Sequence, residues 1–422
     1  MIETLKNAWR IPELRKKILY TLLMLLVFRL GSYVPVPGVD TAALGAMVNQ
    51  YGVLGMMDII AGGSFSNFTL FAMGITPYIN ASIIINLLTV AIPKLERLSK
   101  EGEEGRKKIA QYTRYFTIVL AFIQSIGIII GLGNSVLLST ALPTWLNYVT
   151  IAITLTAGTA LTMWIGERIT EKGIGNGISL LIFAGIVAKF ATWVPKLFNQ
   201  LAAGTVNFWV VPAVIVGALV IIVAIVFVDM GQRRIPVQYA KRVVGRKMYG
   251  GQSTHIPVKV NSTGVMPLIF AMALVNFPMM IAQFWPQSGF YLWYSKWFGS
   301  GSVVYFLIYA LLIIFFTYFY TQISFNPIEI SKNMQQQGGF IPGIRPGKPT
   351  SDYLKRINNR VTMFGALFLA VLAVVPTLFT SSTGMSAAFS ATGLLIVVNV
   401  ALETSKQLES QMLMRHYKGF LK

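Results

Sequence analysis

The most constraining feature of this sequence is a stretch of 20 residues that carries no charge. The stretch, WVVPAVIVGALVIIVAIVFV, runs from Trp209 to Val228. The hydrocarbon core of a bilayer is about 30 Å thick, and a helix needs about 20 apolar residues to cross it. This stretch therefore predicts a membrane-spanning helix.

Nine further apolar stretches are long enough to span a bilayer. They are Ile18–Val34, Phe68–Ile92, Phe116–Leu132, Trp145–Ile165, Gly177–Trp193, Val265–Trp285, Val303–Ser324, Val361–Leu378 and Ala387–Leu402. The chain of 422 residues is 55% hydrophobic and only 12% charged, whereas about a quarter of the residues in an ordinary soluble domain are charged. A soluble globule of this size could not bury so much apolar surface. We therefore expect an all-α, polytopic membrane protein with ten transmembrane helices.

The distribution of basic residues supports this count. The six segments expected on one side of the membrane carry 31 of the 35 Lys and Arg residues. The other side has Lys189, Lys196 and Lys296, and Arg29 lies within the first apolar stretch. An excess of Lys and Arg marks cytoplasmic loops, so we expect both termini in the cytoplasm. No small-residue cleavage site follows the first stretch, which favours a retained helix over a cleaved signal peptide.

The stretch from Gly52 to Phe68 does not fit a spanning helix. It has apolar residues around Asp58, but Gly62, Gly63 and Ser64 interrupt it. Backbone that stops partway through a membrane is tolerated only inside protein or beside a water-filled cavity. The pattern alone leaves two interpretations open: a short helix folded back into a cavity, or an outer loop that lies on the membrane surface.

The predicted helices divide into two equal sets. Five precede the region 200–208 and five follow it. An odd number of helices per half would insert the halves with opposite orientations, as in the inverted repeats that form a cavity at mid-membrane. We therefore expect two inverted five-helix halves, residues 1–200 and 201–422, although the halves show no direct sequence similarity.

The sequence lacks the residues that most catalytic and metal sites require. It has no cysteine, which excludes thiolate sites, and its two histidines, His255 and His416, are too few for a histidine metal cage. The segment GIRPGKPT (343–350) approaches a phosphate-binding loop, but Pro349 replaces the Ser or Thr that would bind Mg²⁺. The glycine-rich KGIGNG (172–177) follows no predicted strand. We expect no enzymatic activity, no metal and no cofactor.

Few polar residues lie inside the predicted helices. The only charged ones are Arg29 and Lys189, near the outer ends, where long side chains can extend to the membrane surface. Four uncharged polar residues lie mid-span: Asn80, Asn86, Gln124 and Asn276. They either form hydrogen bonds between helices or belong to a helix–helix contact that must open. Ion-coupled carriers keep charged residues at mid-membrane. An inverted-repeat secondary transporter is therefore an alternative with less support.

Several segments in the chain are distinctive. They are MGITPYINASIIINLLTVAIPKLERLSKEGEEGRKKIAQYTRY (73–115), ITEKGIGNGISLLIFAGIVA (169–188), GQRRIPVQYAKR (231–242), QSTHIPVKVNSTGVMPLIFA (252–271) and FIPGIRPGKPT (340–350). Together they strongly resemble the SecY family, the central pore subunit of the bacterial Sec protein translocase. The similarity extends from FRLGSYVPVPGVD (28–40) to GLLIVVNVALE (393–403), and only outer loops such as 195–208 and 287–302 match poorly.

The resemblance implies an hourglass pore between the two halves, with a lateral gate between the second and seventh helices. It implies a re-entrant plug helix at about residues 52–67, which favours the folded-back interpretation of this segment. The implied pore ring consists of Ile75, Ile79, Ile178, Ile182, Ile269 and Ile396. The implied plug includes Gly52, Met56, Asp58, Ile60, Gly62 and Ser64. The implied lateral gate includes Ile83, Asn86, Gln124 and Asn276. The implied function is translocation of unfolded secretory proteins and lateral release of their hydrophobic segments into lipid.

Two large basic loops, at about residues 229–261 and 326–360, carry 7 and 6 Lys and Arg residues, more than topology alone requires. The resemblance implies that they dock SecA, the motor ATPase, and the ribosome. The residues carried over are Arg234, Lys241, Arg242, Arg345 and Lys348. Further implied partners are the SecE and SecG subunits, secretory preproteins with signal sequences, the lipid bilayer and, indirectly, signal recognition particle. The implied location is the bacterial cytoplasmic (inner) membrane.

Overall fold

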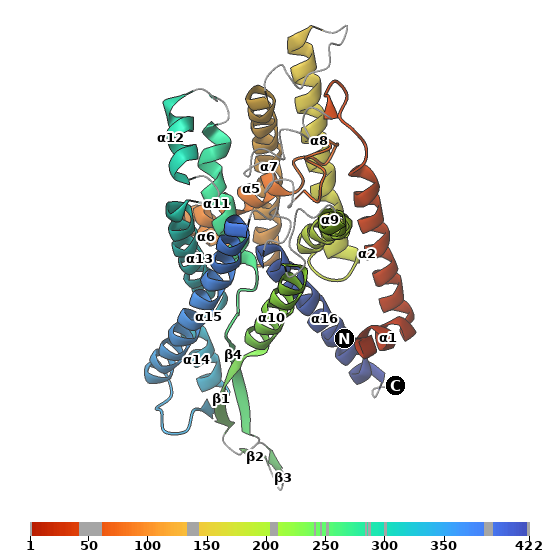
Figure 1. Cartoon of the computed structure of the whole chain (residues 1–422). Helices are drawn as coiled ribbons and strands as arrows, with labels where there is room; N and C mark the ends of the chain where they lie inside the picture. Colours follow the sequence, from red (N-terminus) through yellow and green to blue (C-terminus); the bar gives the residue numbers. More distant parts are fainter. Residues whose placement is uncertain are drawn as a thin grey trace.

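Long apolar helices run side by side through most of the molecule, and a small sheet lies at one end (Figure 1). Helices satisfy their own backbone hydrogen bonds, which suits segments that cannot reach water. The computed structural model describes residues 2–41, 61–132, 143–202, 210–239, 242–244, 247–249, 253–282, 285, 288–298, 302–383 and 391–419.

The first part of the chain contributes seven of the described helices. They are α1 (Ile2–Arg10), α2 (Pro12–Gly31), α5 (Thr76–Ala91), α6 (Pro93–Lys100), α7 (Glu103–Leu132), α8 (Thr144–Lys172) and α9 (Gly177–Ala202). Proline stands near the start of α2, α5 and α6, where its fixed φ favours a helix and its missing N–H is not needed. At Ile92, φ is −105° and ψ is 114°, the extended conformation that a following proline imposes. Helices α5 and α6 consequently meet at a bend of 100°.

The second part adds helices and a sheet. The helices are α10 (Val210–Met230), α11 (Met266–Ala282), α12 (Gly289–Phe298), α13 (Val303–Ser324), α14 (Pro327–Gln336), α15 (Lys348–Thr383) and α16 (Ala391–Gly419). The strands are β1 (Gln232–Tyr239), β2 (Arg242–Val244), β3 (Lys247–Tyr249), β4 (Ser253–Lys259) and β5 (Gly339–Phe340). Strands β4, β1 and β5 form an antiparallel sheet in that order, and β2 pairs with β3.

The helices coincide with most of the predicted apolar stretches. Within the described residues, four helical segments are long and apolar enough to cross a membrane: Glu103–Gly131, Thr144–Lys172, Val303–Gln336 and Lys348–Val375. The bent pair of α5 and α6 makes a fifth if it counts as one span, and Gly177–Ala191, Ile215–Met230 and Met266–Met279 are shorter apolar helices. The chain is thus a mostly helical protein with four or five clear apolar spans.

The predicted stretch Phe68–Ile92 differs from the structure at its start. Residues 61–75 form consecutive turns, and α5 begins only at Thr76. The turn backbone pairs with the chain that follows α2: Leu70 N–H donates to Val34 at 2.8 Å, and Val36 N–H donates to Phe68 at 3.0 Å. These partners replace the helical hydrogen bonds that an apolar stretch of this kind would otherwise form.

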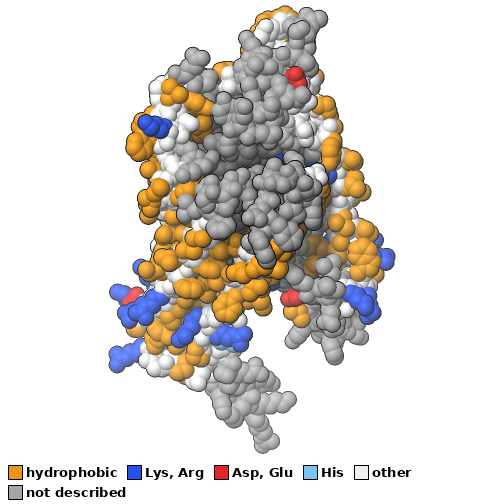
Figure 2. Space-filling view, viewed as in Figure 1, with side chains coloured by type: hydrophobic (Ala, Val, Ile, Leu, Met, Phe, Trp, Pro, Cys, Tyr) orange, Lys and Arg blue, Asp and Glu red, His pale blue; other side chains and the backbone are white. Residues whose placement is uncertain are grey.

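Apolar side chains cover the sides of the bundle. Figure 2 shows them over much of its length, and they include Phe227 of α10, which is 79% exposed. Lys and Arg side chains gather mainly at the end that carries the sheet (Figure 2). Both termini lie toward this end (Figure 1), where Ala8 and Leu14 join Leu408 in one apolar cluster. An apolar belt beside a basic end is the pattern of a membrane protein whose basic residues gather on one side of the bilayer.

Close packing between α8 and the turns of residues 61–75 gives a first prediction. A Cβ atom added at Gly158 would overlap the backbone carbonyl of Leu70. We expect Gly158→Ala to lower the free energy of unfolding by about 1–3 kcal/mol, the usual cost of overpacking. Gly217→Ala in α10 is the control, because nothing lies within 4 Å of the added atom. Thermal unfolding in detergent measures both; equal stability of the two variants would contradict this packing.

Candidate functional site

Six isoleucines from four helices or their first turns meet in the largest apolar cluster of the structure. Ile75, Ile79, Ile182 and Ile396 are between 3% and 7% exposed, and Ile178 and Ile269 are partly buried and pack against the same cluster. Ile75 directly precedes α5 and Ile79 lies within it; Ile178 and Ile182 belong to α9, Ile269 to α11 and Ile396 to α16. All six residues predicted from dispersed motifs thus belong to one large apolar cluster, to which both parts of the chain contribute; that they form a ring stays a prediction.

The start of α9 fixes the direction of its two isoleucines. The Asn176 side-chain oxygen accepts from the N–H groups of Ile178, at 3.1 Å, and Ser179, at 3.4 Å, as a helix N-cap does. Gly177 lies against the Gly166 carbonyl of α8, with no room for a side chain. The KGIGNG segment is therefore a tight connection between α8 and α9, and Ile178 and Ile182, four residues apart, share one helix face.

The predicted plug lies only partly within the described residues. Gly52, Met56, Asp58 and Ile60 fall outside them, whereas Gly62 and Ser64 lie in the turns of residues 61–75. Gly62 has φ +66°, and a Cβ atom there would come 2.6 Å from the Cα of Gly185 in α9. Ser64 is fully buried. This part of the segment is thus packed inside the bundle, which agrees with the condition for non-helical backbone in a membrane protein.

Arg29 of α2 contacts this same segment. Its Nη1 donates to the Gly62 carbonyl at 3.1 Å, and its Nη2 donates to the Tyr33 hydroxyl at 3.0 Å. The guanidinium also lies 4.9 Å from the centre of the Tyr33 ring. The turn backbone and Tyr33 thus hold the guanidinium of Arg29, and its extension to the membrane surface stays a prediction.

The predicted gate residues lie on three neighbouring helices. Helix α11, which carries Asn276, packs against α5 and α7. Ile83 of α5 is 3% exposed within the large apolar cluster, and Asn86 contacts Ser82 one turn before it, at 3.4 Å. Gln124 of α7 is buried, and within the described chain neither of its polar atoms has a hydrogen-bond partner. Ile83 is thus buried among apolar side chains, whereas the buried Gln124 amide on α7 has no hydrogen-bond partner in the described chain.

A polar cavity of about 280 Å³ lies against two of the isoleucines. Its lining includes Ile269 and Ile396, residues 261–264 between β4 and α11, and one face of α16. Lys406 of α16 forms an ion pair with Asp229 at the end of α10, at 2.6 Å, and Asn261 Nδ2 lies 3.5 Å from the same carboxylate. These contacts join the end of α10 to α16 and to the segment between β4 and α11.

Several buried polar atoms of residues that line this cavity have no hydrogen-bond partner in the described part of the chain. Asn399 is 5% exposed, and both of its side-chain polar atoms lack a partner among the described residues; the same holds for Asn261 Oδ1 and Thr263 Oγ1. Partial burial raises the pKa of Glu403, and the Asp229 carboxylate raises it further, against opposing effects of Lys259 and Lys406. Sequence analysis missed Asn399, although its position three residues after Ile396 placed both on one helix face.

The two basic loops form one platform, defined here as β1, β4, β5, α14 and the first turns of α15. Strand β1 comes from the first loop and β5 from the second, and they pair through Gln238 with Phe340 and Tyr239 with Gly339. Beneath the sheet lies one apolar cluster, whose buried members are Ile235, Val237, Val258, Met334, Ile341 and Leu354. Sequence analysis predicted two separate loops, because it had no signal for pairing between segments about a hundred residues apart.

The predicted docking residues occupy different parts of this region. Arg234, Arg345 and Lys348 are exposed, Arg242 begins β2, and Lys241 lies outside the described residues. Thr350 Oγ1 donates to the Arg345 carbonyl at 2.8 Å, and Ser331 Oγ donates to the Gly347 carbonyl at 2.7 Å. Two glycines with positive φ, Gly343 at +81° and Gly347 at +93°, flank the turn. Arg345 is thus presented from a backbone that is fixed at both ends.

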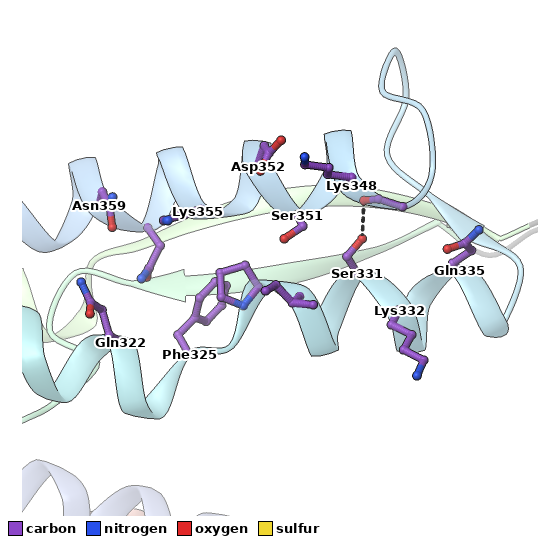
Figure 3. A pocket seen from close by; sticks show the side chains of 14 residues that line it. Gln322, Phe325, Ser331, Lys332, Gln335, Lys348, Ser351, Asp352, Lys355 and Asn359 are labelled. Atoms are coloured by element: carbon purple, nitrogen blue, oxygen red, sulfur yellow. Dashed lines mark hydrogen bonds between the residues drawn. The ribbon is translucent and has the colours of Figure 1, made fainter. Parts of the chain in front are cut away.

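A groove of about 590 Å³ lies beside this turn (Figure 3). Figure 3 shows Ser331 of α14 reaching across to the start of α15, with Lys348, Asp352 and Lys355 along α15 and Lys332 and Gln335 on α14. Phe325 and Ile328 add apolar surface to its lining. Within the described ranges no group of three or more His, Asp or Glu side chains could hold a metal ion.

Comparison with known proteins gives one consistent result. The SecY family model matches residues 69–405. The protein translocase subunit SecY of Halalkalibacterium halodurans is 47% identical over 431 residues, and that of Bacillus subtilis is 45% identical over 433 residues. The H. halodurans comparison covers 100% of both chains.

Solved structures share the fold at lower identity. A structure described as that of a protein-conducting channel superposes with a TM-score of 0.69 at 19% identity and covers 94% of this chain and 93% of its own. Sec61 in the canine ribosome-channel complex from the endoplasmic reticulum superposes with a TM-score of 0.64 at 18% identity, over 94% of this chain and 93% of that one.

The shared apolar cluster of the platform gives a second prediction. Ile235 belongs to this cluster and is 1% exposed. Ile235→Ala should lower the free energy of local unfolding by about 2–5 kcal/mol, because it leaves a cavity. We expect faster amide hydrogen exchange in β1, β4 and β5 together, measured by mass spectrometry, whereas exposed Arg233→Ala should change little. Faster exchange confined to β1 and β4 would contradict a platform that unites the two loops.

Proposed function

The chain belongs to the SecY family, and from this premise we propose that it is the pore subunit of a protein translocase. It moves unfolded secretory proteins across the bacterial cytoplasmic membrane and releases their hydrophobic segments sideways into lipid. It is a conduit rather than an enzyme and has no energy source of its own. The alternative of a secondary transporter is not favoured, because the family is one of translocase subunits and full-length relatives carry that name.

The single observation that carries this proposal is that six isoleucines, from the start of α5 and from α9, α11 and α16, belong to one apolar cluster. We call them the isoleucine ring. A secretory chain brings every type of side chain, and charged or hydrogen-bonding walls would retain some segments and reject others. Aliphatic walls offer no specific partner. A narrow apolar constriction also gates ions by dewetting, so the ring resists leakage while it is empty.

The same arrangement supports a lateral exit between α5 and α11. A signal sequence contains an apolar region of about 7–15 residues, and its transfer to lipid is favourable by about 0.8 kcal/mol for each buried CH₂ group. The apolar contact at Ile83 can separate without breaking an ion pair. Polar Asn86, Gln124 and Asn276 line the proposed gate and weaken its closed state, because polar contacts between membrane helices contribute only about 0.6–2 kcal/mol.

The proposed membrane topology has ten spanning helices in two inverted halves, residues 1–200 and 201–422, with both termini in the cytoplasm. The gathering of Lys and Arg at the sheet end supports this orientation. The segment at about residues 52–67 is proposed to be the plug. The inward packing of Gly62 and Ser64 and the contact of Arg29 with Gly62 support its position inside the bundle.

The platform is the proposed docking face for cytoplasmic partners. Structural relatives include Sec61 in a ribosome-channel complex and a yeast Ssh1 complex bound to the 80S ribosome, which supports the ribosome as one partner. SecA is the proposed motor, and SecE and SecG are the proposed membrane subunits. Exposed Arg234, Arg345 and Lys348 would attract ribosomal RNA phosphates in a salt-dependent way or acidic groups of the motor.

Ion leakage tests the isoleucine ring. We expect Ile79→Ser with Ile178→Ser to raise the conductance of reconstituted vesicles several-fold, because hydroxyl groups stabilise water in the constriction. Ile79→Leu with Ile178→Leu should remain closed, since the walls stay aliphatic. Unchanged conductance in the serine variant, with folded protein recovered, would argue against the ring.

Charge reversal tests the docking turn. Arg345→Glu should weaken binding of the motor to the channel by about tenfold, equivalent to about 1.4 kcal/mol, and slow export accordingly. Lys332→Glu makes the same change of charge on exposed α14 and should have a smaller effect. Binding and the thermal midpoint are measured on the same vesicles; a parallel loss of folded protein and export would contradict a docking role.

A further inference from the structure

The groove between α14 and the start of α15 (Figure 3), here called the α14–α15 groove, lies where two apolar stretches end. Its lining includes Gln322, close to the end of the stretch Val303–Ser324 on α13. It also includes Asn358 and Asn359, just before the stretch Val361–Leu378 on α15. The polar headgroups of a bilayer border its hydrocarbon core. A groove at the polar ends of two apolar helices therefore lies at the depth of the headgroups.

Two exposed apolar helix faces lead away from the groove along α13 and α15, which pack against each other. Each face has residues at intervals of four that are between 49% and 65% exposed: Leu307, Leu311 and Phe315 on α13, and Met363, Leu367 and Val371 on α15. Lys355 and Asn359 of the groove continue the face of α15 at the same interval, and residues four apart share one helix face. A molecule in the groove can therefore extend apolar chains along these two helices.

The charges of the lining favour an anion. The groove is lined by three lysines, Lys332, Lys348 and Lys355, and by one carboxylate, Asp352. All four residues are exposed, and within the described chain no ion pair engages any of them. An anion can therefore reach the ammonium groups without displacing another partner. Gly347 and Lys348 also place the first turn of α15 at the groove, and the N-terminal end of a helix attracts negative charge.

We propose that the α14–α15 groove binds the headgroup of an anionic phospholipid, whose acyl chains lie along the exposed faces of α13 and α15. The phosphate accepts hydrogen bonds from the lysine ammonium groups, and the Ser351 hydroxyl and Asn359 amide offer further donors to the headgroup. Basic pockets between membrane helices bind anionic headgroups in this way. The groove volume of about 590 Å³ lies within the range of about 300–1,000 Å³ that is usual for ligand sites.

A lipid accounts for both the charge and the apolar surface of this groove. Phe325, Pro327 and Ile328 belong to its lining, and Ile328 is 72% exposed. A soluble phosphate or an RNA backbone would use the lysines alone, whereas the glycerol and upper acyl carbons of a phospholipid also cover apolar side chains. The inference does not depend on translocation, so its failure would leave the proposed pore untouched.

The test measures the enrichment of anionic lipid beside the groove. The chain has no cysteine, so Ile323→Cys, at an exposed position next to Gln322, can carry a single fluorophore. The full chain is reconstituted in phosphatidylcholine vesicles that contain either nitroxide-labelled phosphatidylglycerol or nitroxide-labelled phosphatidylcholine. The ratio of quenching by these two lipids is the selectivity. A second label, at Phe227→Cys on α10, reports an exposed apolar position outside the groove lining.

We expect a selectivity of about fivefold for phosphatidylglycerol at position 323 and of about one at position 227. Lys332→Gln with Lys355→Gln leaves one lysine and one aspartate in the lining, and the selectivity at position 323 should fall to about one. Lys100→Gln with Lys107→Gln is the matched control and should retain the selectivity. These two lysines are exposed, lie outside the groove and already pair with glutamates.

Two outcomes would overturn the proposal. Equal selectivity at the two labels, or its retention in Lys332→Gln with Lys355→Gln, would show a general attraction of anionic lipid to the basic end. Complete loss of selectivity on adding glycerol phosphate or a short RNA at constant ionic strength would identify a soluble anion as the occupant. The thermal midpoint of each variant is measured in the same vesicles, and exposed Lys→Gln changes should leave it unchanged.

Discussion

The whole structure depends on one constraint: backbone N–H and C=O groups cannot remain unpaired in hydrocarbon. Helices satisfy it within each segment, and almost all of the described apolar stretches are helical. The exception, residues 61–75, satisfies it by pairing with residues 34–36 and by accepting the guanidinium of Arg29. Such a segment can exist only inside the bundle, and its presence there requires an interior that is not filled by helices alone.

The predicted and observed helices agree where the backbone of an apolar stretch has no hydrogen-bond partner outside its own helix. The bounds of α13 match the predicted stretch Val303–Ser324, and α10 lies within three residues of Trp209–Val228 at either end. They disagree at Phe68–Gly74, where composition favours a helix but distant backbone provides other partners. The isoleucine ring was predicted from motif resemblance; periodicity alone could pair Ile75 with Ile79 and Ile178 with Ile182, but it could not bring the two pairs together. The Asn399 amide and the β1–β5 pairing were missed, since both acquire meaning only from tertiary contacts.

The platform shows how the two basic loops can act as one body. Strand β5 adds to the edge of β1, and residues from β1, β4, α14 and α15 share a single apolar cluster. The first turns of α15 belong to this platform, and the rest of this helix of 36 residues packs against α13 and α16. A force applied at Arg345 would therefore be transmitted to the helices through a packed core rather than through a flexible loop.

The chemistry changes sharply along α16, from Ile396 in the ring to Asn399 in the cavity and then to Glu403 and Lys406. An unfolded chain that enters from water carries solvated peptide groups, and an apolar ring removes their solvent without replacing it. Asn399, which is 5% exposed, therefore marks the point on α16 where the apolar side chains around the proposed ring give way to the charged end of the helix.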